Sequence, residues 1–122
     1  MVNQYRYLMQ KRVWSFVAGG AEHADSLEDA KRELKEEAGY FATTWVKLAT
    51  VPTSPSTTGQ LSDVYLATGL TDGEHNREAG EMDMESKWFT FQEVEDMIER
   101  NELSSFDITD FYLFKKHLAK NI

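Results

Sequence analysis

Several short stretches of this 122-residue chain are rich in apolar, β-branched and aromatic residues, which predicts β-strands. These stretches are residues 2–9, 13–17, 42–50, 63–69 and 84–90. Three other stretches have helical character, namely residues 27–38, 91–100 and 108–120. Short strands around one central helix, followed by two closing helices, predict an α/β (α+β) sandwich. The length suits one domain, so we expect residues 1–122 to form a single domain.

The helix predicted at residues 27–38 has two distinct faces. Ser26 suits its N-cap, and Gly39 suits the residue after its last turn. At about 100° per residue, one face forms a narrow apolar stripe that would pack on a sheet. That stripe consists of Leu27, Ala30, Leu34 and Ala38. An adjoining face gathers Glu33, Glu36 and Glu37.

Three carboxylates on one helix face have two possible explanations. Like charges four residues apart, such as Glu33 and Glu37, destabilise a helix by about 0.2–0.5 kcal/mol. A divalent cation would remove that repulsion, because Mg²⁺ and Mn²⁺ prefer hard oxygen ligands. Alternatively, the glutamates form the solvated face of an amphipathic helix. The helix alone does not decide between the two interpretations.

Composition and charge narrow the classes of function. The formal net charge of −8 argues against binding to nucleic-acid backbones or anionic membranes, which favour basic patches. It is compatible with small phosphorylated substrates, because metal ions can supply positive charge. The sequence has no cysteine, which excludes disulfides, thiolate metal sites and thiol nucleophiles. No apolar run approaches membrane-spanning length, and we expect a cytoplasmic protein.

Residues 19–40, GGAEHADSLEDAKRELKEEAGY, resemble the Nudix box, G-x5-E-x7-R-E-U-x-E-E-x-G-U, where U is bulky and apolar. The second half matches at every fixed position: Arg32, Glu33, Leu34, Glu36, Glu37, Gly39 and Tyr40. The first half departs from the pattern. Asp25 stands where the family has glutamate, and six residues instead of seven separate it from Arg32. The missing residue falls either in the loop near His23 and Ala24 or early in the helix near Ala30. The chain is therefore identified as a member of the Nudix hydrolase superfamily with a box one residue short.

The resemblance implies a fold, a cofactor and roles for the box residues. The fold is an α/β/α sandwich with a mixed sheet and a central metal-binding helix. Glu33, Glu36 and Glu37 would bind Mg²⁺, with Mn²⁺ possible, and the backbone carbonyl of Ala18 would complete the metal site. Arg32 would orient Glu36 or Glu33.

Residues outside the box resemble the ADP-ribose pyrophosphatase subgroup. The quoted segments are NQYR (residues 3–6), WSFVAGG (14–20), LATGL (66–70) and EMDME (81–85), with Pro55 fifteen residues beyond Tyr40. In such enzymes a loop glutamate outside the box can act as general base, and Glu81 is the first candidate, with Glu78 second. The alternative for both is a solvated loop acid.

Three residues are candidates for substrate binding. Arg6 could contact phosphate, because guanidinium pairs well with phosphate oxygens, or it could be an exposed strand residue. Tyr5 and Trp14 could stack on a base, although aromatic residues on strands more often pack in the core.

We therefore expect a Mg²⁺-dependent hydrolase that cleaves the diphosphate of a small nucleoside diphosphate derivative, ADP-ribose or a nucleotide sugar. The alternative is a catalytically weakened Nudix-fold module that binds a nucleotide without turning it over. Relatives usually carry an N-terminal portion before the QYR strand, so this chain resembles a short version of them. A sheet edge left open there would invite pairing with a second copy, and we expect a homodimer.

Overall fold

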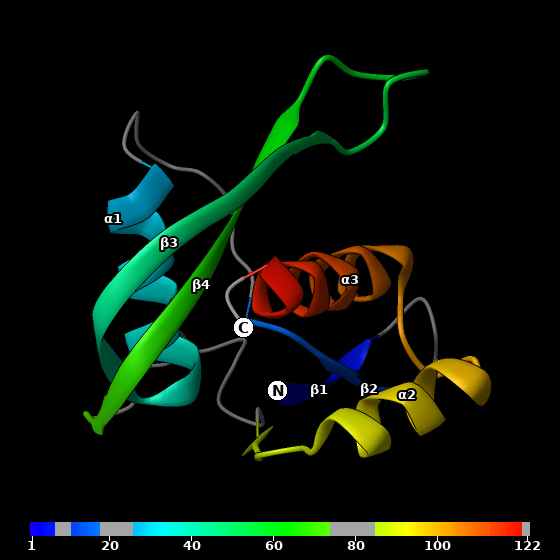
Figure 1. Cartoon of the computed structure of the whole chain (residues 1–122). Coiled ribbons are helices and arrows are strands. Elements are labelled where there is room, and N and C mark those ends of the chain that lie inside the picture. The colour runs from blue at the N-terminus through cyan, green and yellow to red at the C-terminus, as the bar shows by residue number, and fades with distance from the viewer. Residues whose placement is uncertain (7–10, 18–25, 74–84, 121–122) are drawn as a thin grey trace.

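The computed structural model describes residues 1–6, 11–17, 26–73 and 85–120. Its strands are β1 (Val2–Arg6), β2 (Lys11–Ser15), β3 (Tyr40–Pro52), β4 (Leu61–Asp72) and β5 (Glu85–Ser86). Its helices are α1 (Ser26–Glu33), the π-helical segment η1 (Leu34–Ala38), α2 (Phe91–Glu99) and α3 (Ser105–Lys120). Figure 1 shows the long β3–β4 ribbon running between α1 and α3. This layering confirms the expected α/β fold. None of the helices described in these ranges is long and apolar enough to cross a membrane.

All strand pairings in the described residues are antiparallel. β1 lies between β2 and β5, and β3 pairs with β4 along nearly its whole length. Short connections explain the antiparallel β1–β2 and β3–β4 pairs, because a parallel pair needs a crossover of a dozen or more residues. The β1–β5 pair joins segments that lie far apart in the chain. We expected a mixed sheet with both parallel and antiparallel strands, but none of these pairs is parallel.

The two long strands exceed their predicted lengths. Residues 42–50 and 63–69 were expected to be extended, whereas the structure extends them to Tyr40–Pro52 and Leu61–Asp72. Each strand continues for as long as its partner supplies hydrogen bonds, which local patterning does not reveal. The strand expected at residues 84–90 shrinks to Glu85–Ser86, because it pairs with β1 only at Val2 and Asn3.

Local capping explains where the closing helices begin. Thr90 and Glu93 form a reciprocal capping box that starts α2 at Phe91, as predicted. α3 starts at Ser105 rather than at the predicted residue 108. The reason is a second reciprocal pair. The Ser104 hydroxyl donates to Asp107 at 2.8 Å and accepts from the Asp107 backbone N–H at 3.3 Å.

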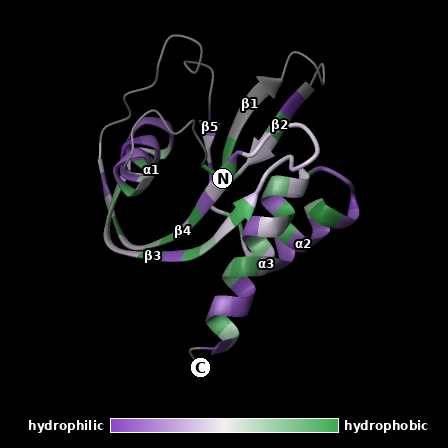
Figure 2. Cartoon of the chain, turned by 90° about the horizontal axis from the view of Figure 1, so that it is seen from above, coloured by the Kyte–Doolittle hydropathy of each residue, from purple (hydrophilic) through white to green (hydrophobic). Residues whose placement is uncertain are grey.

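Aromatic side chains hold the two closing helices together. Phe91 of α2 meets Phe111 and Phe114 of α3 edge to face, with ring centroids 5.7 and 5.3 Å apart. Val94, Met97 and Phe111 are buried there. Figure 2 shows α2 and α3 side by side, with apolar residues in green on both. α3 also contacts the segment that follows β2, since the Phe16 backbone N–H donates to the buried Asp107 carboxylate at 3.0 Å.

The predicted helix at residues 27–38 is confirmed in position but not in form. Its first part is α-helical, and residues 34–38 widen into a π-helical turn. Gly39 ends it in the left-handed conformation, with φ 77°, as predicted. The prediction of Ser26 as N-cap is wrong, because Ser26 is already the first helical residue and its hydroxyl bonds to Asp63 of β4 at 2.6 Å.

Replacing Gly39 by alanine is expected to lower the free energy of unfolding by about 1–2 kcal/mol, because a Cβ strains the left-handed conformation. Urea denaturation measures the loss. Gly59→Ala is the matched control, since an added Cβ there meets no heavy atom within 4 Å. Equal stability of the two variants would contradict the assigned role of Gly39.

Candidate active site on the carboxylate helix

Arg32 stands at the centre of a cluster of carboxylates on α1 and η1. Its guanidinium lies 3.2 Å from Glu33 Oε1, 3.4 Å from Glu36 Oε2 and 3.5 Å from Asp29 Oδ1. The expected contacts of Arg32 with Glu33 and Glu36 are therefore both present. One guanidinium holds three carboxylates in place at once, as its forked donor geometry permits.

These carboxylates are largely removed from solvent. Glu37 and Asp29 are buried, with 4% and 5% of their surface exposed. The side chains of Glu33 and Glu36 are 13% and 17% exposed. Poorly solvated charge of one sign is costly unless a cation balances it. Glu37, buried on the same helical segment, adds a fourth poorly solvated carboxylate, and carboxylate oxygens are ligands that a divalent cation prefers.

Asp29 is a member of this cluster that sequence reasoning missed. It precedes Glu33 by four residues and Glu37 by eight, so it lies near the same face of the helix. That spacing was the available signal. The helical wheel considered only the glutamates in the second half of the box and did not include Asp29, although the Asp29 carboxylate is among the most buried on the helix.

The π-helical turn places Glu36 and Glu37. The Gly39 N–H is shared between the carbonyls of Leu34 and Lys35, both at 3.1 Å, and its bond to Leu34 closes a wide i→i−5 ring. Such turns are rare and occur often at functional sites. A wheel at 100° per residue misplaces side chains across this turn, and the burial of Glu37 could not be predicted from it.

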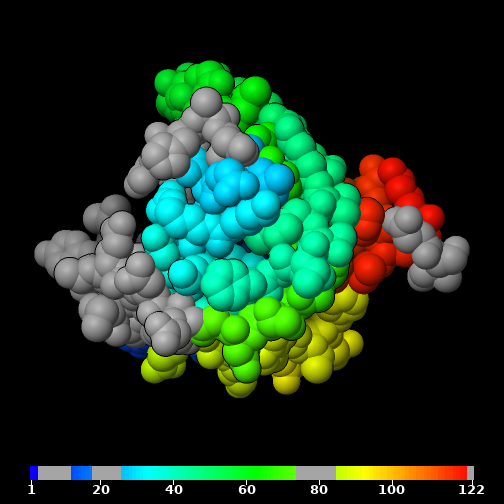
Figure 3. All heavy atoms as spheres, turned by 90° about the vertical axis from the view of Figure 1, so that its left-hand side faces the viewer, coloured from blue at the N-terminus to red at the C-terminus, as the bar shows by residue number. Residues whose placement is uncertain are grey.

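The helix presents this site at one side of the molecule. Figure 3 shows α1 at the surface on that side, with the β3–β4 ribbon beside it. Figure 2 shows that α1 is mostly hydrophilic, in contrast to α3. The apolar stripe of Leu27, Ala30, Leu34 and Ala38 is half-buried rather than fully covered.

The carboxylate oxygens suit a divalent cation, but the described residues do not form a complete metal site. Carboxylate oxygens in excess of the local positive charge are what Mg²⁺ and Mn²⁺ bind. In the ranges that the structure describes, no three acidic or histidine side chains are grouped closely enough to hold a metal ion together. Ala18, the predicted backbone ligand, lies outside those ranges. The metal ligands therefore stay a prediction.

The remaining predicted site residues are only partly described. Glu81 and Glu78 lie outside the described residues, and so does the first half of the box. Tyr5 and Arg6 belong to β1, where only their backbone is described. Trp14 of β2 is half-buried and packs edge to face on Phe89, with centroids 5.0 Å apart. This contact favours packing for Trp14, and its stacking on a base stays a prediction.

Comparison with known proteins identifies the family. Residues 1–110 match the family model of the NUDIX domain, and the chain belongs to that family. It is 36% identical over 106 residues to an ADP-ribose pyrophosphatase of Mycobacterium tuberculosis, which covers 84% of this chain and 51% of that protein. It is 31% identical over 105 residues to an ADP-ribose pyrophosphatase of Bacillus subtilis, which covers 84% of this chain and 57% of that protein.

A solved structure supports the same fold. The crystal structure of an ADP compounds hydrolase matches with a TM-score of 0.86 and 20% identity, covering 98% of this chain and 65% of that chain. The chain spans about half the length of the curated relatives that it matches. Nudix hydrolases generally use divalent metals, which agrees with the excess of carboxylates around Arg32.

Proposed function

We propose that this chain is a Mg²⁺-dependent Nudix pyrophosphohydrolase that cleaves ADP-ribose or a related nucleotide sugar. The observation that carries the proposal is the set of three carboxylates held by Arg32, with the buried Glu37 on the same helical segment of the Nudix box. The printed names of two relatives that are 36% and 31% identical support ADP-ribose as the first substrate to test. Mn²⁺ could replace Mg²⁺, because oxygen ligands accept both.

The helix residues divide into ligands and a positioning residue. Glu33, Glu36 and Glu37 would hold the cation, together with the carbonyl of Ala18. Arg32 contacts Glu33 and Glu36 and limits their rotation, so it orients the carboxylates rather than binding the metal. When bound, divalent cations neutralise the charge of the diphosphate and favour attack at phosphorus.

The proposed reaction adds water across the diphosphate. The oxygen of water forms a bond to one phosphorus, and the bridging P–O bond breaks. ADP-ribose would thus give AMP and ribose 5-phosphate. We assign Glu81 to accept the proton of water, with Glu78 as the second candidate, because a base must act away from the cations to keep its basicity. Arg6 would contact phosphate, and Tyr5 and Trp14 would contact the base.

A nucleotide-binding module without turnover is the second candidate. The box that is one residue short favours it, since the loop before α1 carries the predicted carbonyl ligand. The absence of a three-ligand group among the described side chains points the same way. Such a module would gain thermal stability from ADP-ribose without forming product. The homodimer expected from the sequence also stays a prediction.

Product analysis tests the proposed function. The purified chain, incubated with ADP-ribose and Mg²⁺, is expected to release AMP and ribose 5-phosphate in equal amounts, as measured by ion-exchange chromatography. Excess EDTA is expected to abolish release, and added Mg²⁺ to restore it. Stabilisation by ADP-ribose without any product would contradict hydrolysis and favour the binding module.

A further inference from the structure

A polar cluster outside the Nudix box joins the first residue of α1 to the β3–β4 ribbon. The Ser26 hydroxyl donates to Asp63 Oδ2 at 2.6 Å and shares a hydrogen bond with the Tyr65 hydroxyl at 2.7 Å. On the ribbon side, the Thr50 hydroxyl donates to Asp63 Oδ1 at 2.6 Å, and Lys47 Nζ lies 3.3 Å from the same oxygen. We call these five residues the Asp63 cluster.

Asp63 is held as a charged carboxylate by its partners. Hydrogen bonds from Ser26 and Thr50, followed by Lys47, lower the pKa of Asp63 to about 2. Both of its oxygens are engaged, and hydrogen bonds to a charged acceptor are shorter and stronger than neutral ones. Tyr65 is itself held by Trp45, whose ring meets it edge to face with centroids 6.4 Å apart. The cluster is therefore a specific attachment rather than a loose surface contact.

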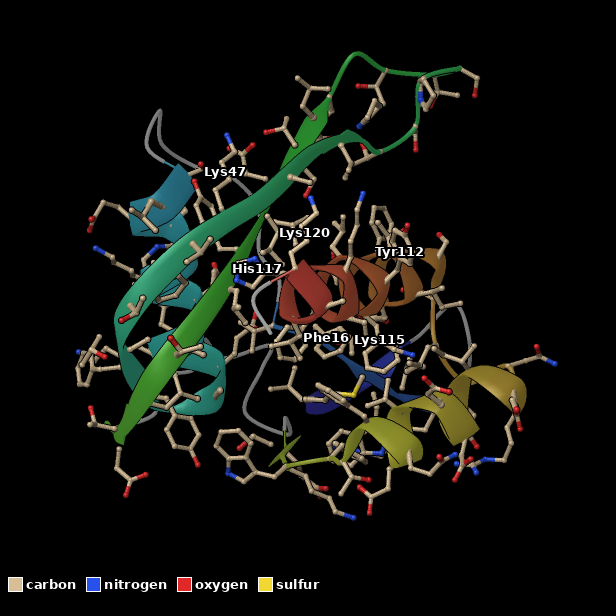
Figure 4. The ribbon with its side chains drawn as sticks, viewed as in Figure 1. Phe16, Lys47, Tyr112, Lys115, His117 and Lys120 are labelled. Atoms are coloured by element: carbon tan, nitrogen blue, oxygen red, sulfur yellow. The ribbon has the colours of Figure 1, made fainter. Side chains whose placement is uncertain are left out.

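The same strand also holds the other end of the helical segment. The Gly73 N–H donates to the Gly39 carbonyl at 2.7 Å, directly after β4 ends. Ser26 is thus tied near the start of β4 and Gly39 just past its end. Figure 4 shows Lys47 on β3 beside the start of α1. The carboxylates of the box lie between these two attachments.

A helix transmits a displacement of its first turn to the residues that follow. Glu33 lies seven residues after Ser26, which is about 10 Å along the helix axis at 1.5 Å per residue. The box is one residue short between Asp25 and Arg32, so the position at which the helix starts determines where its carboxylates come to lie. Metal ligands tolerate little misplacement, because groups that merely orient ligands already change affinity about 10–100-fold.

We propose that Asp63 is a positioning residue of the hydrolase site, which holds the first turn of α1 on β4 and thereby places Glu33, Glu36 and Glu37 for metal binding. This inference rests on the proposed function for its metal. It assigns Asp63 no contact with substrate. Its effect passes through Ser26 to the helix.

The test measures metal binding directly and catalysis separately. In the full chain, Asp63→Asn keeps the shape of the side chain and removes its charge. We expect Mn²⁺ binding, followed by electron paramagnetic resonance without substrate, to weaken about 10-fold. We expect kcat for ADP-ribose to fall about as much, with KM changed less than about 2-fold, because Asp63 positions the metal ligands and does not bind substrate.

Variants of Ser26 provide the rescue, and Lys31 provides the control. Ser26→Ala is expected to reproduce the loss, and Ser26→Thr, which keeps the hydroxyl, to restore most of the binding. Lys31→Met changes the exposed side of the same helix, where Lys31 pairs with Glu28 at 3.3 Å, and is expected to behave as wild type. If Asp63→Asn fails to fold, the comparison of Ser26→Ala with Ser26→Thr tests the proposal instead.

The outcomes separate the two proposals. Wild-type Mn²⁺ affinity and kcat in folded Asp63→Asn, whatever its melting temperature, would overturn the positioning role. A chain that binds Mn²⁺ but releases no AMP would overturn hydrolysis, while the Mn²⁺ arm would still decide the role of Asp63. A chain that binds no Mn²⁺ would overturn both, because there would be no site to position.

Discussion

Glu37→Gln is expected to lower kcat with ADP-ribose by more than about 100-fold, since even outer-shell partners of metal ligands change activity about 10–100-fold. Glu37 has 4% of its surface exposed and lies in the π-helical turn beside Glu36. The amide keeps the size of the side chain but removes the charge that a divalent cation requires. Initial rates of AMP release at saturating Mg²⁺ measure the effect.

The matched control is Glu28→Gln, the same chemical change on the same helix, where the side chain is 62% exposed. It should retain wild-type rates. Full activity in Glu37→Gln would remove Glu37 from the metal site.

Arg32→Met is expected to lower the free energy of unfolding by about 3 kcal/mol in EDTA, the lower end of the cost of breaking a buried ion pair. Methionine keeps part of the aliphatic stem, but the carboxylates of Asp29, Glu33 and Glu36 lose their shared cation. Saturating Mg²⁺ should restore part of the loss, because a ligand of the folded state stabilises it. Urea denaturation with and without Mg²⁺ measures both quantities.

The control for Arg32 is an exposed ion pair. Arg100 bonds to Glu102 through two nitrogens, at 3.0 and 3.1 Å, in the turn after α2. Arg100→Met should destabilise the protein much less than Arg32→Met, since exposed pairs contribute little. A similar small loss for Arg32→Met would show that the carboxylates do not depend on its charge. A loss that Mg²⁺ leaves unchanged would argue against a cation site beside Arg32.

Several elements follow from local sequence because their determinants are local. The helix at residues 27–38 and its end at Gly39 follow from periodicity and from a position that requires φ above zero. The start of α2 follows from Thr90 and Glu93, three residues apart. The seven fixed positions in the second half of the Nudix box predict the family, and Arg32 does contact Glu33 and Glu36.

Other features depend on partners distant in the chain. Asp63 looked like any polar strand residue until folding brought it to Ser26, which lies 37 positions earlier. The lengths of β3 and β4 depend on each other through pairing. The π-helical turn buries Glu37 in a way that an ideal wheel does not anticipate.

One physical difference separates the features that follow from local sequence from those that depend on distant parts of the chain. Spacing along the helix is a covalent property, so the sequence was sufficient to predict that Arg32 pairs with Glu36, four residues later. Burial, shared charge and attachment to the ribbon are properties of packing between segments. The role of Asp63 as the anchor of the site therefore depends on the packing of α1 against β4, and only the tertiary structure reveals it.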